Sequence, residues 1–366
     1  MKCLTSNIRF GVGGPHDYLN TDWQFTFYIL MDLKTQFLGM TLKNPFVVGS
    51  SPLANTLDRV KKLEDAGAAA LVLHSLFEEQ IIHETQIPDF EDERYGKILA
   101  GGEGVLPAAE EFPNTSESYL KLIQDVKSQT EIPVIASLNG ISEGVWIEYA
   151  RLIEEAGADA LELNLYTLPT HDDDSSHYVE KRLVEIVDVT RNSVSIPLSV
   201  KISSRHTSIC NFAQRIEYAG ANGLVVFNRV FSADFDFKKQ KLTPKVLWSQ
   251  PNDLLERLRW VSILYPQLKM DLAVTGGVHS GEGALKSVLC GAAVVQCVTH
   301  LMREGIDSLS TMIDEFTQLA EENGYSDLSE VRGSLSKLLQ PDPEIIERAN
   351  YLRILQGWSA DGNEPS

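Results

Sequence analysis

The chain repeats one short pattern four times, in which a helix ends at glycine and leads directly into an apolar run. Glycine suits the left-handed residue that closes a helix, and a continuous apolar run is typical of a parallel strand that is buried on both faces. Each copy therefore predicts a helix followed by a buried strand. The copies are EDAGAAALVL, EEAGADALEL, EYAGANGLVV and VLCGAAVVQC, and their glycines are Gly67, Gly157, Gly220 and Gly291.

Four further strand openings alternate with these copies along the chain: NPFVVGS, IPVIASL, IPLSVKI and MDLAVTGG, beginning at Asn44, Ile132, Ile196 and Met270. Eight strands in strict alternation with helices predict an α/β fold, a closed (β/α)8 TIM barrel. The predicted strands are 45–49, 68–74, 133–137, 159–165, 197–202, 223–228, 271–275 and 292–297, and helices are expected within 56–66, 148–156, 209–219, 282–290 and 305–320.

The length of 366 residues is compatible with one barrel that carries additions. We expect an N-terminal extension of doubtful role at 1–30, the barrel at 31–325 and a helical tail at 326–366. Two connections, 78–116 and 229–250, are too long for plain strand-to-helix loops and leave the C-terminal end of a strand. Barrel enzymes carry their chemistry at that end, so these connections are interpreted as lids or substrate walls, with decoration or an oligomer contact as the alternative.

The composition disfavours several classes of function. The net charge of −19 at pH 7 opposes a polyanionic partner, and no Lys/Arg cluster indicates a basic groove, so we expect no nucleic acid. No apolar run approaches the roughly 18 residues of a membrane span, and we expect no membrane. The cysteines show no CxxC spacing, which predicts core residues in a reducing, cytoplasmic compartment and no metal site. They are Cys3, Cys210, Cys290 and Cys297.

Polar residues stand where several predicted strands end. Gly276 and Gly277 follow the seventh strand, where barrels commonly bind a phosphate through backbone N–H groups, although a plain turn also uses glycine. Lys201 ends the fifth strand; burying it is costly unless it meets a negative group such as a carboxylate, a phosphate or a reduced cofactor ring, and the alternative is a lysine that reaches solvent. Asn164 and Asn228 end the fourth and sixth strands and either recognise an amide-like edge or form turns.

Six motifs along the barrel form a set: NPFVVGSS at 44–51, GADALELNL at 157–165, IPLSVKI at 196–202, GANGLVVFN at 220–228, VTGGVHSG at 274–281 and CGAAVVQCVT at 290–299. Together they resemble the dihydroorotate dehydrogenase family of FMN-dependent barrels, particularly the soluble branch that includes the pyrimidine-reducing domain of dihydropyrimidine dehydrogenase. The resemblance covers almost the whole barrel, from Met31 to about Gly305. It implies bound FMN, hydride transfer between a substrate carbon–carbon bond and flavin N5, and a place in pyrimidine biosynthesis.

The resemblance also implies roles for individual residues. Lys201 is expected near the flavin N1 and O2 edge, where positive charge stabilises the reduced flavin, and Asn164 is expected to touch both flavin and substrate. The phosphate is expected on the backbone of Gly276, Gly277, Val298 and Thr299, although the family usually has glycine where Val298 stands. The other implied flavin contacts are Ser50, Ser75 and Ser137.

The residues at the positions that bind substrate in the family differ from the family motifs. His74 stands at the end of the predicted second strand, where the family has a lysine that reaches ligand and flavin. After the fourth strand the family reads NxSCPN or NxSSPN, whose cysteine or serine is the base, whereas this chain reads NLYTLPT and places Thr167 at that position. The asparagine-bearing loop NxxGxxN is not recognisable within 84–116. Asn228 remains as an implied substrate contact, followed by Arg229 in place of the usual serine or threonine.

Two residues are therefore candidates for the group that takes the substrate proton. The Thr167 hydroxyl is a poor base unless a hydrogen-bonded relay activates it. His74 has an ordinary pKa near neutrality and can move the proton if its ring faces the flavin. The sequence leaves both candidates open.

Three functions remain open at this point. The first is an FMN oxidoreductase that converts dihydroorotate to orotate or acts on another dihydropyrimidine-like substrate. The second is an enzyme similar to the tRNA-dihydrouridine synthases, which the acidic charge and the missing loop cysteine disfavour. The third is a flavin-binding partner subunit with a degenerate substrate site.

The expected partners follow from the first function. Besides a small-molecule substrate, the chain needs an electron acceptor, and it has no iron–sulfur cysteine motif of its own. We therefore expect a redox partner protein, a soluble acceptor or oxygen. Barrel relatives often pair, so a homodimer is a further alternative, although no residue pattern indicates one.

Overall fold

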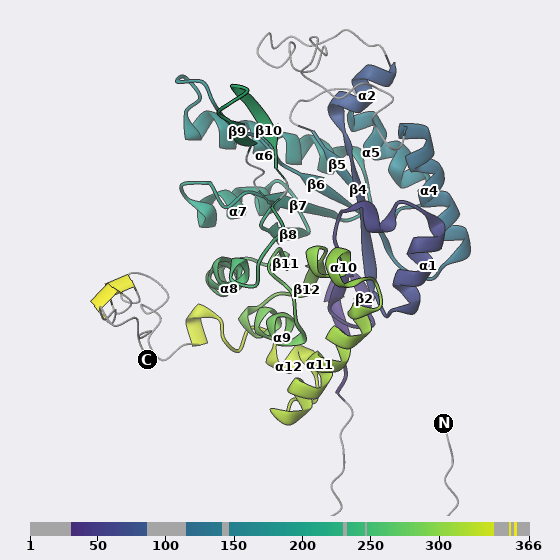
Figure 1. Cartoon of the computed structure of the whole chain (residues 1–366), viewed down its shortest axis with the longest axis vertical. Helices are drawn as coiled ribbons and strands as arrows, with labels where there is room; N and C mark the ends of the chain where they lie inside the picture. Colours follow the sequence, from purple (N-terminus) through teal and green to yellow (C-terminus); the bar gives the residue numbers. More distant parts are fainter. Residues whose placement is uncertain are drawn as a thin grey trace, which may run out of the picture.

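The computed structural model describes residues 31–85, 115–140, 146–229, 233–245, 247–339, 351–352 and 355–356. Within them, eight parallel strands close into a barrel that helices surround (Figure 1). The strands follow one another around the barrel in chain order, so the (β/α)8 prediction is confirmed. They are β3 (Phe46–Val48), β4 (Ala70–Phe77), β5 (Val134–Asn139), β6 (Ala160–Asn164), β7 (Leu198–Ile202), β8 (Gly223–Val226), β11 (Asp271–Thr275) and β12 (Val294–Cys297).

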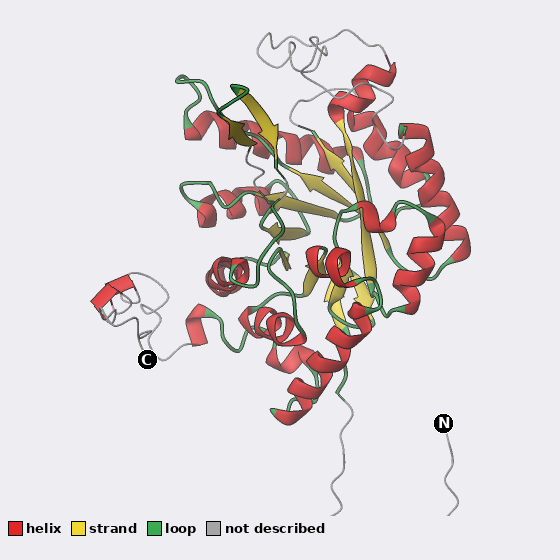
Figure 2. Ribbon diagram, in the orientation of Figure 1, coloured by secondary structure: helices red, strands yellow, loops and turns green. Residues whose placement is uncertain are grey.

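The outer layer consists of helices, as Figure 2 shows in red. Several of them begin at a side chain that accepts the N–H group three residues on, as Thr56 does from Arg59 and Ser280 from Gly283. Outward strand residues pack against this layer. The helices that follow the strands are α1 (Leu57–Asp65), α2 (Glu78–Thr85), α4 (Ser116–Gln129), α5 (Trp146–Glu155), α6 (Ser176–Ser193), α7 (Ile209–Tyr218), α8 (Asp253–Leu264), α9 (Gly281–Cys290), α10 (Thr299–Glu304) and α11 (Ser308–Glu322).

The interior of the barrel is apolar at its N-terminal end. Inward residues such as Val47, Val72 and Ile135 pack there in one buried cluster with a short hairpin, β1 (Thr35–Phe37) and β2 (Met40–Leu42). The hairpin is tied to the strand starts, because the Leu38 N–H group donates to the Asp271 carboxylate at 2.9 Å. This end of the barrel is therefore closed, and polar interior positions are left to the opposite end.

Some boundaries differ from the sequence predictions. The second barrel strand was predicted to end at 74, but β4 extends to Phe77, so the expectation that His74 closes this strand is wrong. The long connection 229–250 contains an antiparallel hairpin, β9 (Ala233–Asp236) and β10 (Lys241–Pro244). The connection 78–116 contributes α2 at its start, while 86–114, like the extension 1–30, lies outside the described residues.

The predicted helical tail is only partly described. It contains α12 (Leu328–Val331) and a 3-10 helix, Lys337–Leu339, whereas most of 340–366 lies outside the described residues. The proposed division of the chain into extension, barrel and tail stays a prediction.

Replacing Gly291 with alanine is expected to destabilise the barrel by about 3 kcal/mol. This residue ends α9 with φ at 124°, and an added Cβ would lie 2.3 Å from the Tyr265 Cγ atom. Gly305→Ala is a matched control, because Gly305 has φ at 93° but an added Cβ would meet no atom within 4 Å; it should cost about 1 kcal/mol. Urea denaturation measures both losses, and equal losses would contradict a steric role for Tyr265.

Candidate active site

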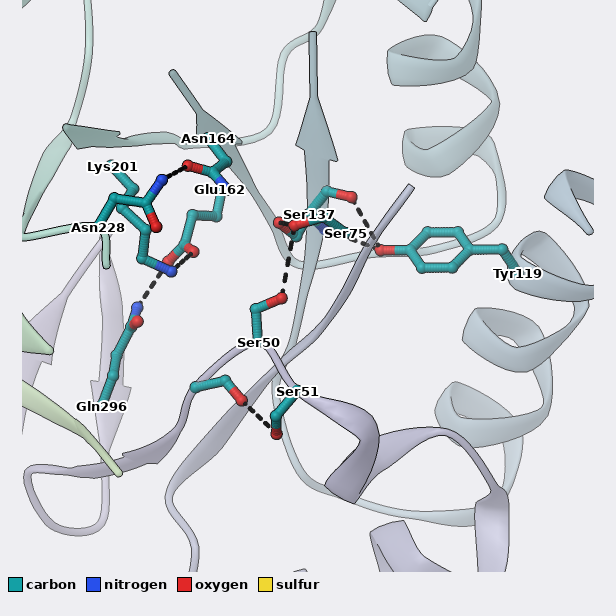
Figure 3. A network of polar contacts seen from close by, with 11 residues as sticks. Ser50, Ser51, Ser75, Tyr119, Ser137, Glu162, Asn164, Lys201, Asn228 and Gln296 are labelled. Atoms are coloured by element: carbon teal, nitrogen blue, oxygen red, sulfur yellow. Dashed lines mark hydrogen bonds and ion pairs between the residues drawn. The ribbon is translucent and has the colours of Figure 1, made fainter. Parts of the chain in front are cut away.

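Three serine hydroxyl groups from neighbouring strands meet inside the barrel. Ser75 on β4 lies 2.8 Å from Ser137 on β5, measured between their Oγ atoms, and 3.5 Å from Ser50, which follows β3 (Figure 3). Ser137 is fully buried. The sequence predicted these serines as three separate flavin contacts, and the structure brings them together into one hydroxyl row.

A β-bulge in β4 decides which side chain joins this row. Val72 pairs with Ile135 and Ser75 pairs with Ser137, so three steps along β4 match two steps along β5. One extra residue reverses the alternation, and Ser75 takes the inward position that His74 would otherwise occupy. The His74 ring instead packs edge-on against Tyr119 of α4, with 5.0 Å between the ring centroids. Burial lowers the pKa of His74.

Tyr119 fixes the hydroxyl row from the helix layer. Its hydroxyl group accepts a hydrogen bond from the Ser137 N–H group at 2.8 Å and donates one to the Ser137 carbonyl at 3.3 Å (Figure 3). The tyrosine is fully buried, and this burial raises its pKa. A neutral phenol that both donates and accepts therefore holds the backbone of β5 at the row.

A buried ion pair lies beside the row. The Lys201 Nζ atom on β7 is 2.5 Å from Glu162 Oε1 on β6, and Gln296 Nε2 on β12 donates to Glu162 Oε2 at 2.6 Å (Figure 3). Glu162, Gln296 and Lys201 are only 0%, 1% and 7% exposed, respectively. Of the alternatives that the sequence left open for Lys201, the structure shows burial against a carboxylate.

Two amides complete the polar mouth of the barrel. Asn228, which follows β8, donates through Nδ2 to the Asn164 Oδ1 atom at 2.6 Å. Asn164 pairs with Lys201 in the parallel register of β6 and β7, so both Cα atoms lie at the same level of the barrel. Each amide keeps further donor or acceptor atoms for a ligand.

The predicted phosphate loop has the conformation that glycine allows. Gly276 and Gly277 follow β11 with φ at 84° and 86°. The Arg257 guanidinium lies against Gly276, 3.3 Å from the position of an added Cβ, and donates through Nε to the Thr275 carbonyl at 3.0 Å. The next strand leads to Val298, which precedes the first residue of α10. The loop thus combines two glycines of positive φ with a nearby cation.

The family model for dihydroorotate dehydrogenase matches residues 112–319, which is more than half of the chain. The chain belongs to the dihydroorotate dehydrogenase family. It is 25% identical over 329 residues to the NAD-dependent dihydropyrimidine dehydrogenase subunit PreA of Escherichia coli K12, covering 86% of this chain and 79% of that protein. It is also 26% identical over 315 residues to the catalytic subunit of dihydroorotate dehydrogenase B from Pyrococcus abyssi, covering 84% of this chain and all of that protein.

A third relative comes from another archaeon. The corresponding catalytic subunit from Methanocaldococcus jannaschii is 24% identical over 318 residues, which cover 82% of this chain and 97% of that subunit. These relatives are named dehydrogenases, and this member of the dihydroorotate dehydrogenase family is an oxidoreductase that acts on CH–CH bonds.

Thr167, predicted as a candidate base, lines a cavity that does not include the hydroxyl row or the ion pair. Thr167 belongs to the loop after β6, and together with the segment after β7 this loop encloses a cavity of about 270 Å³. His206 lines the same cavity; its Nδ1 atom is 3.6 Å from the Glu180 carboxylate, and burial lowers its pKa to about 4. Glu180 is also paired with Arg215 at 3.3 Å. His74 does not line this cavity, so the structure does not bring the two candidate bases together.

The sequence alone did not point to several of these residues. Glu162 was visible as a charged residue two positions before Asn164, which is the spacing of one face of a strand. Tyr119, Gln296 and His206 carried no comparable signal, because their contacts come from distant parts of the chain. In the described part of the chain, no group of three acidic, histidine or cysteine side chains could hold a metal ion, and no helix is long and apolar enough to cross a membrane.

Replacing Tyr119 with phenylalanine is expected to destabilise the protein by about 1–3 kcal/mol, because it leaves the buried Ser137 N–H group unpaired. The same change at Tyr218, which is 85% exposed, is the matched control and should leave stability unchanged. Urea denaturation followed by circular dichroism compares the two variants. Equal stability of Y119F and Y218F would show that the hydroxyl group does not hold β5.

Proposed function

We propose that this chain is an FMN-dependent oxidoreductase that oxidises dihydroorotate, or a related dihydropyrimidine, at a carbon–carbon single bond as a step of pyrimidine biosynthesis. When bound, the flavin would supply N5 as the hydride acceptor. The observation that carries the proposal is the buried Lys201 ammonium group, which is paired with Glu162 and belongs to a residue level with Asn164 of the amide pair. A positive charge in that place suits an electron-accepting ring.

The residues at the mouth fit a flavin mononucleotide. The Ser50, Ser75 and Ser137 hydroxyls and the Asn164 amide offer both donors and acceptors, which the polar edge of the ring requires. The backbone N–H groups of Gly276 and Gly277 are proposed to hold the phosphate, and Arg257 adds a cation beside Gly276. Val298 and Thr299, at the start of α10, are proposed to complete the phosphate site.

The substrate is proposed to bind against Asn164 and Asn228. Thr167 is our first candidate for the proton acceptor, because its loop follows Asn164 directly and the half-buried His206 in the same cavity supports a relay. His74 is the second candidate; its ring lies on the Tyr119 side of β4, opposite the hydroxyl row, which makes it the weaker one. A degenerate site in a flavin-binding subunit remains the alternative function, supported by the departures from the family motif.

A partner protein is the proposed electron acceptor. The relative from Escherichia coli is named a subunit of an NAD-dependent enzyme, and the archaeal relatives are named catalytic subunits. Among the three described cysteines, Cys210 is half-buried, whereas Cys290 and Cys297 are buried and burial raises the pKa of both thiols, which disfavours a reactive thiolate at these two positions. Electrons would therefore leave through a second protein or a soluble acceptor.

The visible absorption spectrum of the purified protein, recorded anaerobically before and after dihydroorotate is added, tests the proposed function. We expect an oxidised flavin spectrum that bleaches on addition of dihydroorotate. A flavin that stays oxidised with dihydroorotate and with dihydrouracil would contradict the proposed substrates and favour the degenerate subunit. A protein that binds no FMN would overturn the cofactor assignment.

Stopped-flow flavin reduction distinguishes the two candidate bases. T167V should slow reduction by about 10²–10⁴-fold without changing flavin content, since a lost general base has that effect. T207V is the matched control, because Thr207 lines the same cavity but lies on the segment after β7; its rate should be unchanged. H74A should slow reduction less than about tenfold. A large loss in H74A with an unchanged rate in T167V would reverse the assignment.

A further inference from the structure

The Lys201 ammonium group is not an isolated cation. It lies 2.5 Å from the Glu162 carboxylate, and the second oxygen of this carboxylate accepts from Gln296 at 2.6 Å. Figure 3 shows the three side chains converging from three strands. The pair is therefore close to electrically neutral, with its negative end fixed by two partners. The carboxylate therefore weakens the attraction of Lys201 for negative charge on a bound flavin ring.

Stability alone does not account for the pair. Burying two charges costs several kcal/mol per ion, and replacing a buried pair with apolar side chains of similar volume is often neutral or stabilising. The layer beneath it is already a well-packed apolar cluster that includes Ala160 and Val294, each two residues before a member of the network. A carboxylate at position 162 thus calls for a role beyond filling the barrel.

The order of the residues along the strands explains how the two charges meet: the lysine side chain extends from the mouth toward the deeper carboxylate. Lys201 is level with Asn164, whereas Glu162 lies two residues earlier on β6 and so one inward layer deeper in the barrel. Figure 3 shows the ammonium group beside the carboxylate, so a ligand at the mouth meets both charges together. The field of such a dipole falls off faster than the field of a single charge, so much of the attraction of Lys201 for negative charge is offset.

We propose that Glu162 tunes the flavin through Lys201: it holds the ammonium group in place and lowers the reduction potential of the bound flavin by offsetting its charge. This inference rests on the proposed function, because it requires FMN beside Lys201. Glu162 acts through another residue and is a positioning residue. Its role is separate from the hydride and proton transfers, which involve neither of its oxygens.

The test is the reduction potential of the bound flavin, measured by equilibration with a reference dye. In E162Q the amide still accepts a hydrogen bond from Lys201, but the negative charge is gone, so the flavin should become easier to reduce. We expect at least a tenfold higher ratio of reduced to oxidised flavin at a fixed potential, which is about 30 mV for a two-electron couple. E162D keeps the charge and should return the ratio toward the wild-type value.

Ser199→Ala is the matched control. Ser199 pairs with Glu162 in the register of β6 and β7 and is buried, but its change removes no charge. It should leave the potential within about twofold of the wild-type ratio, because no charge near the ring is altered. A potential that is unchanged in E162Q, or that moves equally in S199A, would overturn the inference.

A second variant covers the outcome that E162Q does not fold. The double variant E162Q/K201M buries no charge, and removing both partners of a buried pair is commonly tolerated. If Glu162 offsets Lys201, this variant changes the ratio less than tenfold; a large shift toward oxidised flavin would show that Lys201 acts as an uncompensated cation. Flavin content of the wild-type protein is measured first. Absence of flavin there defeats the proposed function, whereas an unchanged potential defeats only this inference.

Discussion

The interior of a closed eight-stranded barrel has to be filled by the side chains that point inward at every second strand position. In this protein the filling changes character along the barrel axis. The N-terminal end is packed with apolar side chains and sealed by the β1–β2 hairpin, whereas the C-terminal end holds hydroxyls, amides and one ion pair. Most of these buried polar groups bond to a neighbour on an adjacent element, although the Gln296 Oε1 and Ser199 Oγ atoms have no partner among the described residues. The candidate active site therefore lies at the C-terminal end of the barrel, where the apolar side chains of the interior give way to polar ones.

The alternation of strand side chains between the two faces of the sheet also explains why the prediction for His74 was wrong. A single extra residue in β4 exchanges the faces of His74 and Ser75, so the serine joins the interior and the histidine meets Tyr119. Nothing in the letters VLHSL indicates a bulge, because each residue is compatible with a regular strand. The motif resemblance placed His74 at the position of a family lysine that reaches the flavin. Such a resemblance carries over a position in the chain but not the direction of the side chain.

The fold could be predicted because its signals are local. Glycine at a helix end and the apolar run behind it occupy about ten neighbouring residues, and four such copies with four further strand openings define a barrel. Strand ends likewise identified Lys201 and Asn164. The partners of these residues were beyond reach, since Glu162 is 39 positions from Lys201 and Gln296 is 134 from Glu162. Such pairings are set by barrel register, which appears only when all strands are placed.

The departures from the family pattern are of two physical kinds. At Val298 the departure is accommodated: an added Cβ on Gly49 would lie 2.8 Å from the Val298 Cγ2 atom, so the valine side chain occupies space that glycine at position 49 leaves open. The backbone N–H group of Val298 is unaffected by this exchange, and a phosphate bound by backbone groups can be retained. At Thr167 the difference from the family motif affects the proposed chemistry, because a threonine hydroxyl stands where the motif has a cysteine thiol or a serine hydroxyl.

A neighbouring glycine can make room for the larger Val298 side chain, but no change in packing gives the Thr167 hydroxyl the proton affinity of a cysteine thiolate. His206 lines the same cavity as Thr167, and its Nδ1 atom is 3.6 Å from the Glu180 carboxylate. Because burial lowers its pKa to about 4, the imidazole is neutral near pH 7, with one nitrogen that accepts and one that donates a hydrogen bond, as a relay requires. A hydroxyl base in this protein would thus depend on the loops after β6 and β7 together, whereas the cysteine or serine of the family stands on the loop after β6 alone.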